Sequence, residues 1–134
     1  MIAALFATVG LLVTMGYFML GSLPLLVLKH DTPLDARFIR AMFHHYYRAV
    51  LVTSVGACLA YAFAGRTGFA AGMGSVAALA WLSRRLMLPS MDALRQRIED
   101  GDAAAIPVFR RRHVQGMLAN ALQLAVVAVS LTAL

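Results

Sequence analysis

Two adjacent histidines, His44 and His45, stand just before a long apolar segment and are followed by Tyr46 and Tyr47. Imidazole side chains ligate metal ions and haem and transfer protons, and a phenol hydroxyl can hydrogen-bond to them. Neighbouring residues of one helix point about 100° apart, so this pair is poorly placed to ligate a single ion. We therefore predict no metal site from the pair itself. What matters is which histidine faces the protein interior.

Helical spacing separates the two histidines. His44 falls on one stripe with basic residues, which are Arg37, Arg40 and Arg48. His45 falls on a stripe of apolar and small residues, which are Leu34, Phe38, Ala41, Ala49, Val52 and Gly56. Residues three or four apart share a helix face. We predict that His44 lies on a wet basic face and that His45 points into a helical bundle.

A second polar stripe lies near the C-terminus and comprises His113, Gly116, Asn120 and Gln123. Counted along a helix from the basic residues at 112, Asn120 is about 12 Å deep and Gln123 about 16 Å deep. Tyr17, counted back from position 29, is about 18 Å deep. Two interpretations are open: hydrogen bonds between helices, or a polar pocket for a small lipophilic ligand such as a quinone. The candidate site residues are His45, His113, Asn120, Gln123 and Tyr17.

The composition predicts that these side chains lie in a membrane protein. Of the 134 residues, 61% are hydrophobic and 13% are charged, whereas soluble domains carry roughly 25% charged residues. We predict one integral membrane domain over 1–134. Cys58 is the single cysteine, which excludes an internal disulfide and a thiolate zinc site. The chain has no phosphate-binding loop, HExxH or GxSxG motif, and no motif specifies a cofactor.

Four apolar runs predict an all-α polytopic protein, a bundle of four transmembrane helices. The predicted spans are 2–28, 38–64, 67–88 and 109–134. The first run has no basic residues before it and is longer than the roughly 7–15 apolar residues of a signal peptide, so we expect it to be retained. The tight joint at 65–67 makes the second and third spans an antiparallel hairpin. The second helix begins at Thr32 and Pro33, because threonine caps and proline starts helices.

The segment before the last span predicts an additional short helix. Pro89 is expected to end the third helix, since proline lacks the N–H that continues a helix. Ser90 then caps a short cytoplasmic interfacial helix over about 90–100, which ends at Gly101. Its apolar residues would rest on the membrane and its charged residues would face water.

The basic residues predict the orientation. Eleven of the twelve Lys and Arg residues fall in 29–48 and 84–112, and only Arg66 lies elsewhere. Positive loops stay in the cytoplasm, so we expect a bacterial inner membrane protein with both termini in the periplasm. The net charge of +6 then reflects orientation and attraction to anionic lipid headgroups. The sequence has no nucleic-acid-binding motif.

Small residues recur every four positions in the middle spans, at Gly56, Ala60 and Ala64 and at Gly68 and Gly72. Small side chains let helix backbones approach closely in lipid. We predict that these faces form the helix contacts of the bundle or of an oligomer.

The stretch FRRRHVQGMLANALQL (109–124) resembles the start of the last helix in four-span bacterial membrane proteins similar to the cisplatin-resistance-associated transmembrane protein family. LPSMDALRQRI (88–98) resembles the proline-containing segment before that helix. The basic start of the last span is also similar to that of anthrone-oxygenase-like small membrane proteins. The resemblance implies a four-span architecture and carries over His113 and Asn120. Between them, 114–119 read VQGMLA, without the serine that often stands there in the family.

We consider three functions for a protein with these features. The first is an accessory or structural subunit that packs against membrane partners or a second copy of itself. The second is a membrane redox or oxygenase-like protein that binds haem, metal or quinone near His45 and His113. A carrier is disfavoured, because Asp, Glu, Lys and Arg are absent from the deep parts of the spans, where transporters place ionisable groups.

Overall fold

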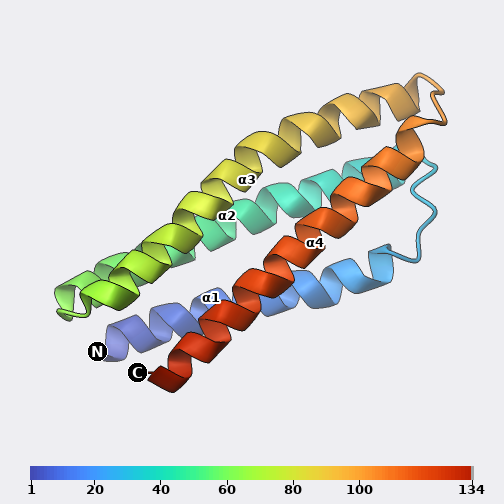
Figure 1. The fold of residues 1–134 in the computed structure, drawn as a ribbon. Helices are drawn as coiled ribbons and strands as arrows, with labels where there is room; N and C mark the ends of the chain where they lie inside the picture. The colour runs from blue at the N-terminus through green and yellow to red at the C-terminus, as the bar shows by residue number, and fades with distance from the viewer. Residues whose placement is uncertain (134) are drawn as a thin grey trace.

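The computed structural model describes residues 1–133, and four α-helices make up most of them. The helices are α1 (Ile2–Leu25), α2 (Pro33–Phe63), α3 (Thr67–Glu99) and α4 (Ala105–Ser130), and a 3-10 turn, η1, covers Leu131–Ala133. They run alternately in opposite directions, so both termini and the α2–α3 turn lie at one end (Figure 1). The α1–α2 and α3–α4 loops lie at the other end. The prediction of an all-α bundle is confirmed.

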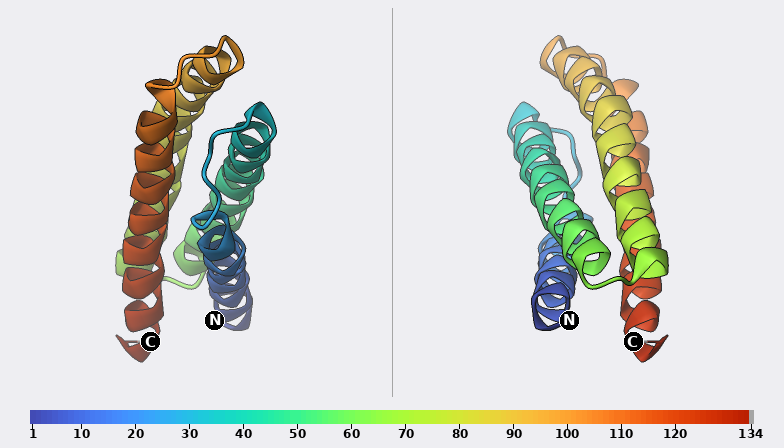
Figure 2. Two further views of the ribbon diagram at one scale, coloured as in Figure 1. Left: turned by 90° about the vertical axis from the view of Figure 1, so that its right-hand side faces the viewer. Right: turned by 90° about the vertical axis from the view of Figure 1, so that its left-hand side faces the viewer.

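The helices pack in a ring. α2 packs against α1 and α3, and α4 packs against α3 and α1, as the two side views of Figure 2 show. α2 and α3, which make the most extensive contact of any pair, are joined by a turn in which Gly65 has a positive φ of 71°. Glycine adopts this left-handed conformation without a steric penalty, which allows the tight hairpin that the sequence predicts.

The start of α2 follows its local sequence. The backbone N–H of Asp35 donates a hydrogen bond to the Thr32 hydroxyl at 3.2 Å, and Pro33 is the first helical residue. The cap satisfies one of the free N–H groups of the first turn. With 31 residues, α2 is about 46 Å long, which is longer than a membrane core of about 30 Å.

The predicted break at Pro89 is wrong. α3 runs without interruption from Thr67 to Glu99 with Pro89 inside it, so 90–100 forms the last turns of α3 and not a separate interfacial helix. A proline removes one helical hydrogen bond, and tertiary contacts can compensate for that loss. Here Asp92, one turn beyond the proline, is held by Arg40 of α2 through two contacts of 2.8 and 2.9 Å.

Three helical segments are long and apolar enough to cross a membrane: Ile2–Leu25, Pro33–Phe63 and Ala105–Ala133. Large apolar side chains point away from the bundle along its length, for example Phe6, which is 75% exposed, and Phe63, which is 90% exposed. An outer surface of this kind is unusual in water and is consistent with a membrane protein.

Aromatic residues of three helices fill the interior. Phe18 of α1 stacks on Tyr46 of α2 with ring centroids 3.9 Å apart, and Phe43 meets Phe18 edge-on at 5.0 Å. Phe109 of α4 is fully buried at the loop end of the same core. These rings place the polar groups described below at fixed positions between the helices.

Ala60 packs against the core, but the three glycines of the predicted faces do not form contacts within the bundle. Gly56, Gly68 and Gly72 are exposed, and a Cβ atom added at any of them would meet no other atom within 4 Å. The close approach lies instead at Gly116 of α4, where an added Cβ would collide with the ring of Phe43.

Candidate functional site

The structure reverses the predicted roles of the two adjacent histidines. His45 is exposed, whereas His44 is half-buried and its Nδ1 is enclosed without a hydrogen-bond partner. The buried face of α2 consists of larger residues, which include Ile39, Phe43, Tyr46, Tyr47, Val50 and Tyr61. The prediction that His45 points into the bundle is therefore wrong. An apolar, small-residue face can point toward lipid as well as inward, so this pattern does not distinguish inside from outside.

His45 instead lies on an outer groove between α1 and α2. The groove has a volume of about 470 Å³ and is lined by Tyr17, His45 and Tyr46 among mostly apolar side chains. Tyr17 is 81% exposed, so the groove opens to the surroundings of the bundle. Two of the five candidate residues therefore meet here, on the surface of the protein and not at its centre.

Asn120 is buried at the centre and connects three helices. Its Nδ2 donates to the backbone carbonyl of Met15 in α1 at 3.2 Å, and its Oδ1 accepts a hydrogen bond from the Tyr46 hydroxyl of α2. Gln123, about one turn further along α4, is half-buried. Asn120 is thus used for hydrogen bonding between helices. Tyr46 links it to the groove, because the ring of Tyr46 lines the groove while its hydroxyl reaches Asn120.

His113 pairs with a residue that the sequence analysis missed. The Nδ1 of His113 lies 3.0 Å from the Nε2 of His30, and both side chains are fully buried. His30 lies in the α1–α2 loop with a φ of 61°, which is rare for a residue other than glycine. No spacing pattern marks this loop histidine. The only local signal is the following Asp31-Thr32-Pro33, which is typical of a turn before a helix.

The hydrogen bond between His30 and His113 holds the α1–α2 loop against α4, and we call this pair the histidine clasp. One ring donates the shared hydrogen and the other accepts it, so the accepting ring is neutral. Arg110 of α4 reinforces the clasp by donating to the carbonyl of Leu26 at 3.1 Å. The other two ring nitrogens, His30 Nδ1 and His113 Nε2, are enclosed without a partner within normal hydrogen-bond geometry. This arrangement can position a loop and hold one proton between the two rings.

Burial keeps His30 neutral. It lowers the pKa of His30 below 6.5, and Arg110 acts in the same direction, while the carbonyl of Leu28 and the carboxylates of Asp35 and Asp31 oppose the change. A buried imidazole loses hydration when it becomes charged. The clasp is therefore expected to be stable at neutral pH and to weaken in acid.

We expect the thermal stability of the protein in detergent to fall as the pH drops below about 6.5. The unfolded chain takes up a proton at His30 more readily than the folded protein, so acid favours unfolding. The measurement is Tm against pH for the wild type and His30→Asn, since asparagine tolerates positive φ and does not titrate. His45→Gln, which removes an exposed histidine, is the control. A pH dependence equally steep in the wild type and His30→Asn would contradict the role of His30.

Within residues 1–133, no group of three or more His, Cys, Asp or Glu side chains is placed to hold a metal ion. The histidine that His113 contacts is His30 and not His45. The five candidate residues are thus divided among the outer groove (Tyr17 and His45), the loop clasp (His113) and α4 (Asn120 and Gln123).

The structure is a helical bundle with a groove between α1 and α2, a buried Asn120 that links three helices, and the histidine clasp. The resemblance of 109–124 to four-span bacterial families stays a prediction. Comparisons of this chain with protein-family models, with curated proteins and with solved structures find no match.

Proposed function

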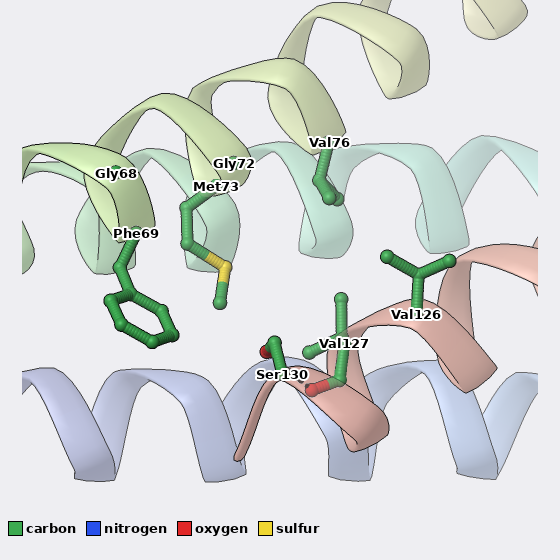
Figure 3. A pocket seen from close by; sticks show the side chains of 8 residues that line it. All are labelled: Gly68, Phe69, Gly72, Met73, Val76, Val126, Val127 and Ser130. Atoms are coloured by element: carbon green, nitrogen blue, oxygen red, sulfur yellow. Dashed lines mark hydrogen bonds between the residues drawn. The ribbon is translucent and has the colours of Figure 1, made fainter. Parts of the chain in front are cut away.

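We propose that the protein is an accessory or structural subunit of a bacterial inner membrane, and that it packs beside a transmembrane helix of a partner. The observation that carries this proposal is an apolar groove of about 270 Å³ between α3 and α4. The groove lies over the exposed Gly68 and Gly72 of α3 and is bordered on α4 by Val126, Val127 and Ser130 (Figure 3).

The shape of this α3–α4 groove suits another helix. Gly68 and Gly72 are one turn apart, and a Cβ added at either would meet nothing within 4 Å. A second helix can therefore approach the α3 backbone closely, which is how helices associate in lipid. The hydroxyl of Ser130 already donates to the carbonyl of Val127 at 2.7 Å, so an apolar partner would leave that donor satisfied.

Photo-crosslinking in native membranes tests this proposal. A photoactivatable residue placed at Gly72 is expected to crosslink to a membrane protein, and the same residue at the exposed Gly56 of α2, outside the groove, is the control. A crosslinked product of twice the chain mass would identify a second copy of this protein as the partner. Crosslinks to lipid alone at Gly72, or equal protein crosslinking at both positions, would contradict the proposal.

The orientation belongs to the same proposal, in which α3 is a fourth span. Residues 67–82 carry no charge, and Arg84 is the first charged residue after them. Arg84 lies about 27 Å along the helix from the α2–α3 turn, close to the thickness of a membrane core of about 30 Å. The concentration of basic residues at the loop end supports cytoplasmic loops and periplasmic termini.

Thiol labelling of intact cells tests this topology in a background without Cys58. A cysteine in place of the exposed Ala3 is expected to react with a membrane-impermeant reagent. A cysteine in place of the exposed Ala103, in the α3–α4 loop, is expected to react only after the cells are opened. The reverse pattern would overturn the orientation, and equal labelling of both in intact cells would overturn the four-span arrangement.

The α1–α2 groove favours a second candidate function, the binding of a quinone. His45 and Tyr17 supply an imidazole and a phenol at a groove that is otherwise apolar, and a quinone needs donors for its oxygens beside apolar contacts for its tail. Haem held between His45 and His113 fits less well, because His45 is exposed on the outer groove whereas His113 is fully buried beside His30. A redox or oxygenase-like activity would depend on this groove.

Quenching of intrinsic fluorescence by a short-chain ubiquinone tests the second candidate. The wild type is expected to bind it, and His45→Ala and Tyr17→Phe are expected to bind more weakly. Gln123→Ala, which lies outside the groove, is the control. Equal binding by all four proteins would exclude this groove as the quinone site, and a Soret band in the purified protein would indicate haem instead.

A further inference from the structure

A basic cleft lies between α2 and α3 on the loop side of the bundle. It has a volume of about 430 Å³ and is lined by Arg40, Arg84, Arg85, Leu88, Pro89 and Asp92. Three guanidinium groups therefore share the cleft with a single carboxylate. The position is close to the level at which α3 changes from an uncharged to a charged sequence.

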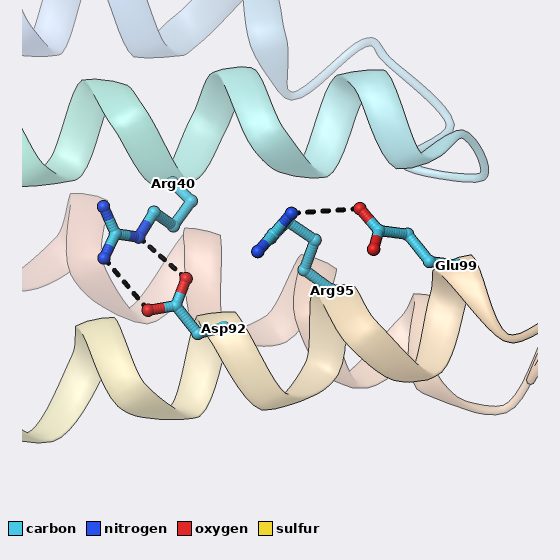
Figure 4. Close-up of polar contacts among 4 residues, drawn as sticks. All are labelled: Arg40, Asp92, Arg95 and Glu99. Carbon is cyan, nitrogen blue, oxygen red and sulfur yellow. Dashed lines mark hydrogen bonds and ion pairs between the residues drawn. The ribbon is translucent and has the colours of Figure 1, made fainter.

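The one carboxylate of the cleft is already paired. Arg40 forms a two-point ion pair with Asp92, with Nε 2.8 Å from Oδ1 and Nη2 2.9 Å from Oδ2 (Figure 4). Arg84 and Arg85 take part in none of the ion pairs within residues 1–133, which are Arg40–Asp92, Arg95–Glu99 and Arg97–Asp102. The cleft thus keeps two uncompensated positive charges.

The two guanidinium groups outside the ion pair differ in their surroundings. Arg84 is half-buried, and its Nε is enclosed without a hydrogen-bond partner. The guanidinium of Arg85 lies 4.6 Å from the centre of the Trp81 ring, a cation–π contact that fixes its direction. A buried N–H without an acceptor is costly, so Arg84 in particular is suited to receive an anionic oxygen from outside the chain.

The surroundings of the cleft indicate where such an anion would come from. Trp81 and Leu82 are exposed beside the two arginines, toward the uncharged part of α3, which is the membrane side if α3 is the fourth span proposed above. Tryptophan is enriched where lipid tails meet headgroups. The half-buried His44 of α2 also has an Nδ1 without a partner. An anion here would meet cationic donors on its polar side and apolar surface on the other.

We propose that this cleft binds the phosphate group of an anionic membrane phospholipid. Arg84 and Arg85 donate to the phosphate oxygens, because guanidinium groups match phosphate geometry, and the acyl chains follow the exposed apolar surface at Trp81 and Leu82. Basic pockets between helices at the cytoplasmic face suit acidic headgroups. The site is separate from the α3–α4 groove and needs no partner helix.

Lipid retention measured by native mass spectrometry tests this inference. Protein in neutral detergent is titrated with phosphatidylglycerol and, separately, with phosphatidylcholine. The wild type is expected to retain phosphatidylglycerol preferentially, and Arg84→Gln/Arg85→Gln is expected to lose about tenfold in affinity or more. Arg111→Gln/Arg112→Gln removes the same charge from exposed positions outside the cleft and is expected to keep the preference.

Two further arms separate the possible outcomes. Arg84→Lys/Arg85→Lys keeps the charge but loses the planar donors, so an intermediate affinity is expected and folding is less affected. Inorganic phosphate is added in excess to distinguish a free anion from a lipid. Equal loss in the two glutamine pairs, no preference for phosphatidylglycerol in the wild type, or full displacement of the lipid by inorganic phosphate would overturn the proposal.

Discussion

Replacing Gly116 by alanine is expected to lower the free energy of unfolding by about 1–3 kcal/mol, the usual cost of overfilling a packed core. A Cβ at this position would collide with the ring of Phe43 and lie 3.4 Å from the terminal methyl group of Met87. Phe43 cannot move aside easily, because it is fully buried and its ring contacts Phe18, Tyr47 and His113. The collision therefore forces α2 and α4 apart or strains the ring.

Gly56→Ala is the matched control for this prediction. Gly56 lies within α2, is exposed, and has no atom within 4 Å of an added Cβ. Alanine is the better helix former by about 1 kcal/mol, so this variant is expected to be neutral or slightly more stable. Reversible unfolding in mixed detergent and dodecyl sulfate measures both. Equal stability of Gly116→Ala and Gly56→Ala would show that α4 does not approach Phe43 as described.

Replacing Asn120 by alanine is expected to destabilise the bundle by about 1–3 kcal/mol. The change removes the hydrogen bond to the Met15 carbonyl and leaves the hydroxyl of Tyr46 without its partner in the core. A buried polar group without a partner loses its hydrogen bonds to water and gains no hydrogen bond within the protein. Gln123→Ala removes a similar amide from a half-buried position on the same helix and is expected to have the smaller effect.

A double-mutant cycle isolates the contact between Asn120 and Tyr46. Tyr46→Phe removes only the hydroxyl, so Asn120→Ala and Tyr46→Phe should together cost less than the sum of the two single changes. The ring of Tyr46 keeps its stacking on Phe18 in this variant. Additive effects would mean that the two side chains do not share a hydrogen bond.

The local sequence predicted the start of α2 and the turn between α2 and α3 correctly. Thr32 and Pro33 begin α2 as expected, and Gly65 provides the turn into α3. These features depend on groups within a few residues of one another, namely a hydroxyl near a free N–H and a backbone without a Cβ. Pro89 was misjudged because α3 continues through it, and contacts made beyond the proline, such as that of Asp92 with Arg40, come from another helix.

The polar stripe of α4 did mark its buried face, at His113, Gly116 and Asn120, but the apolar stripe of α2 did not show which face of that helix points inward. In water, an apolar stripe marks the buried side of a helix, but in a membrane both the interior and the surroundings are apolar. His45 and Gly56 therefore shared an apparently buried stripe that lies on the outside. The residues of α2 that do face the interior of the bundle include Phe43, Tyr46 and Tyr61. Their burial depends on the shape and hydrogen bonding of the residues around them.

The sequence by itself determined that this protein is helical, apolar on its surface and basic at one end, because composition, hydropathy and charge are sums over residues that need no partner. Only the tertiary structure decided that His113 meets His30, that Asn120 meets Tyr46, and that Arg84 and Arg85 share a cleft without a free carboxylate. Each of these sites joins residues that are far apart in the chain. Their distances depend on how the helices rotate and pack, which is set by the fit of many side chains at once.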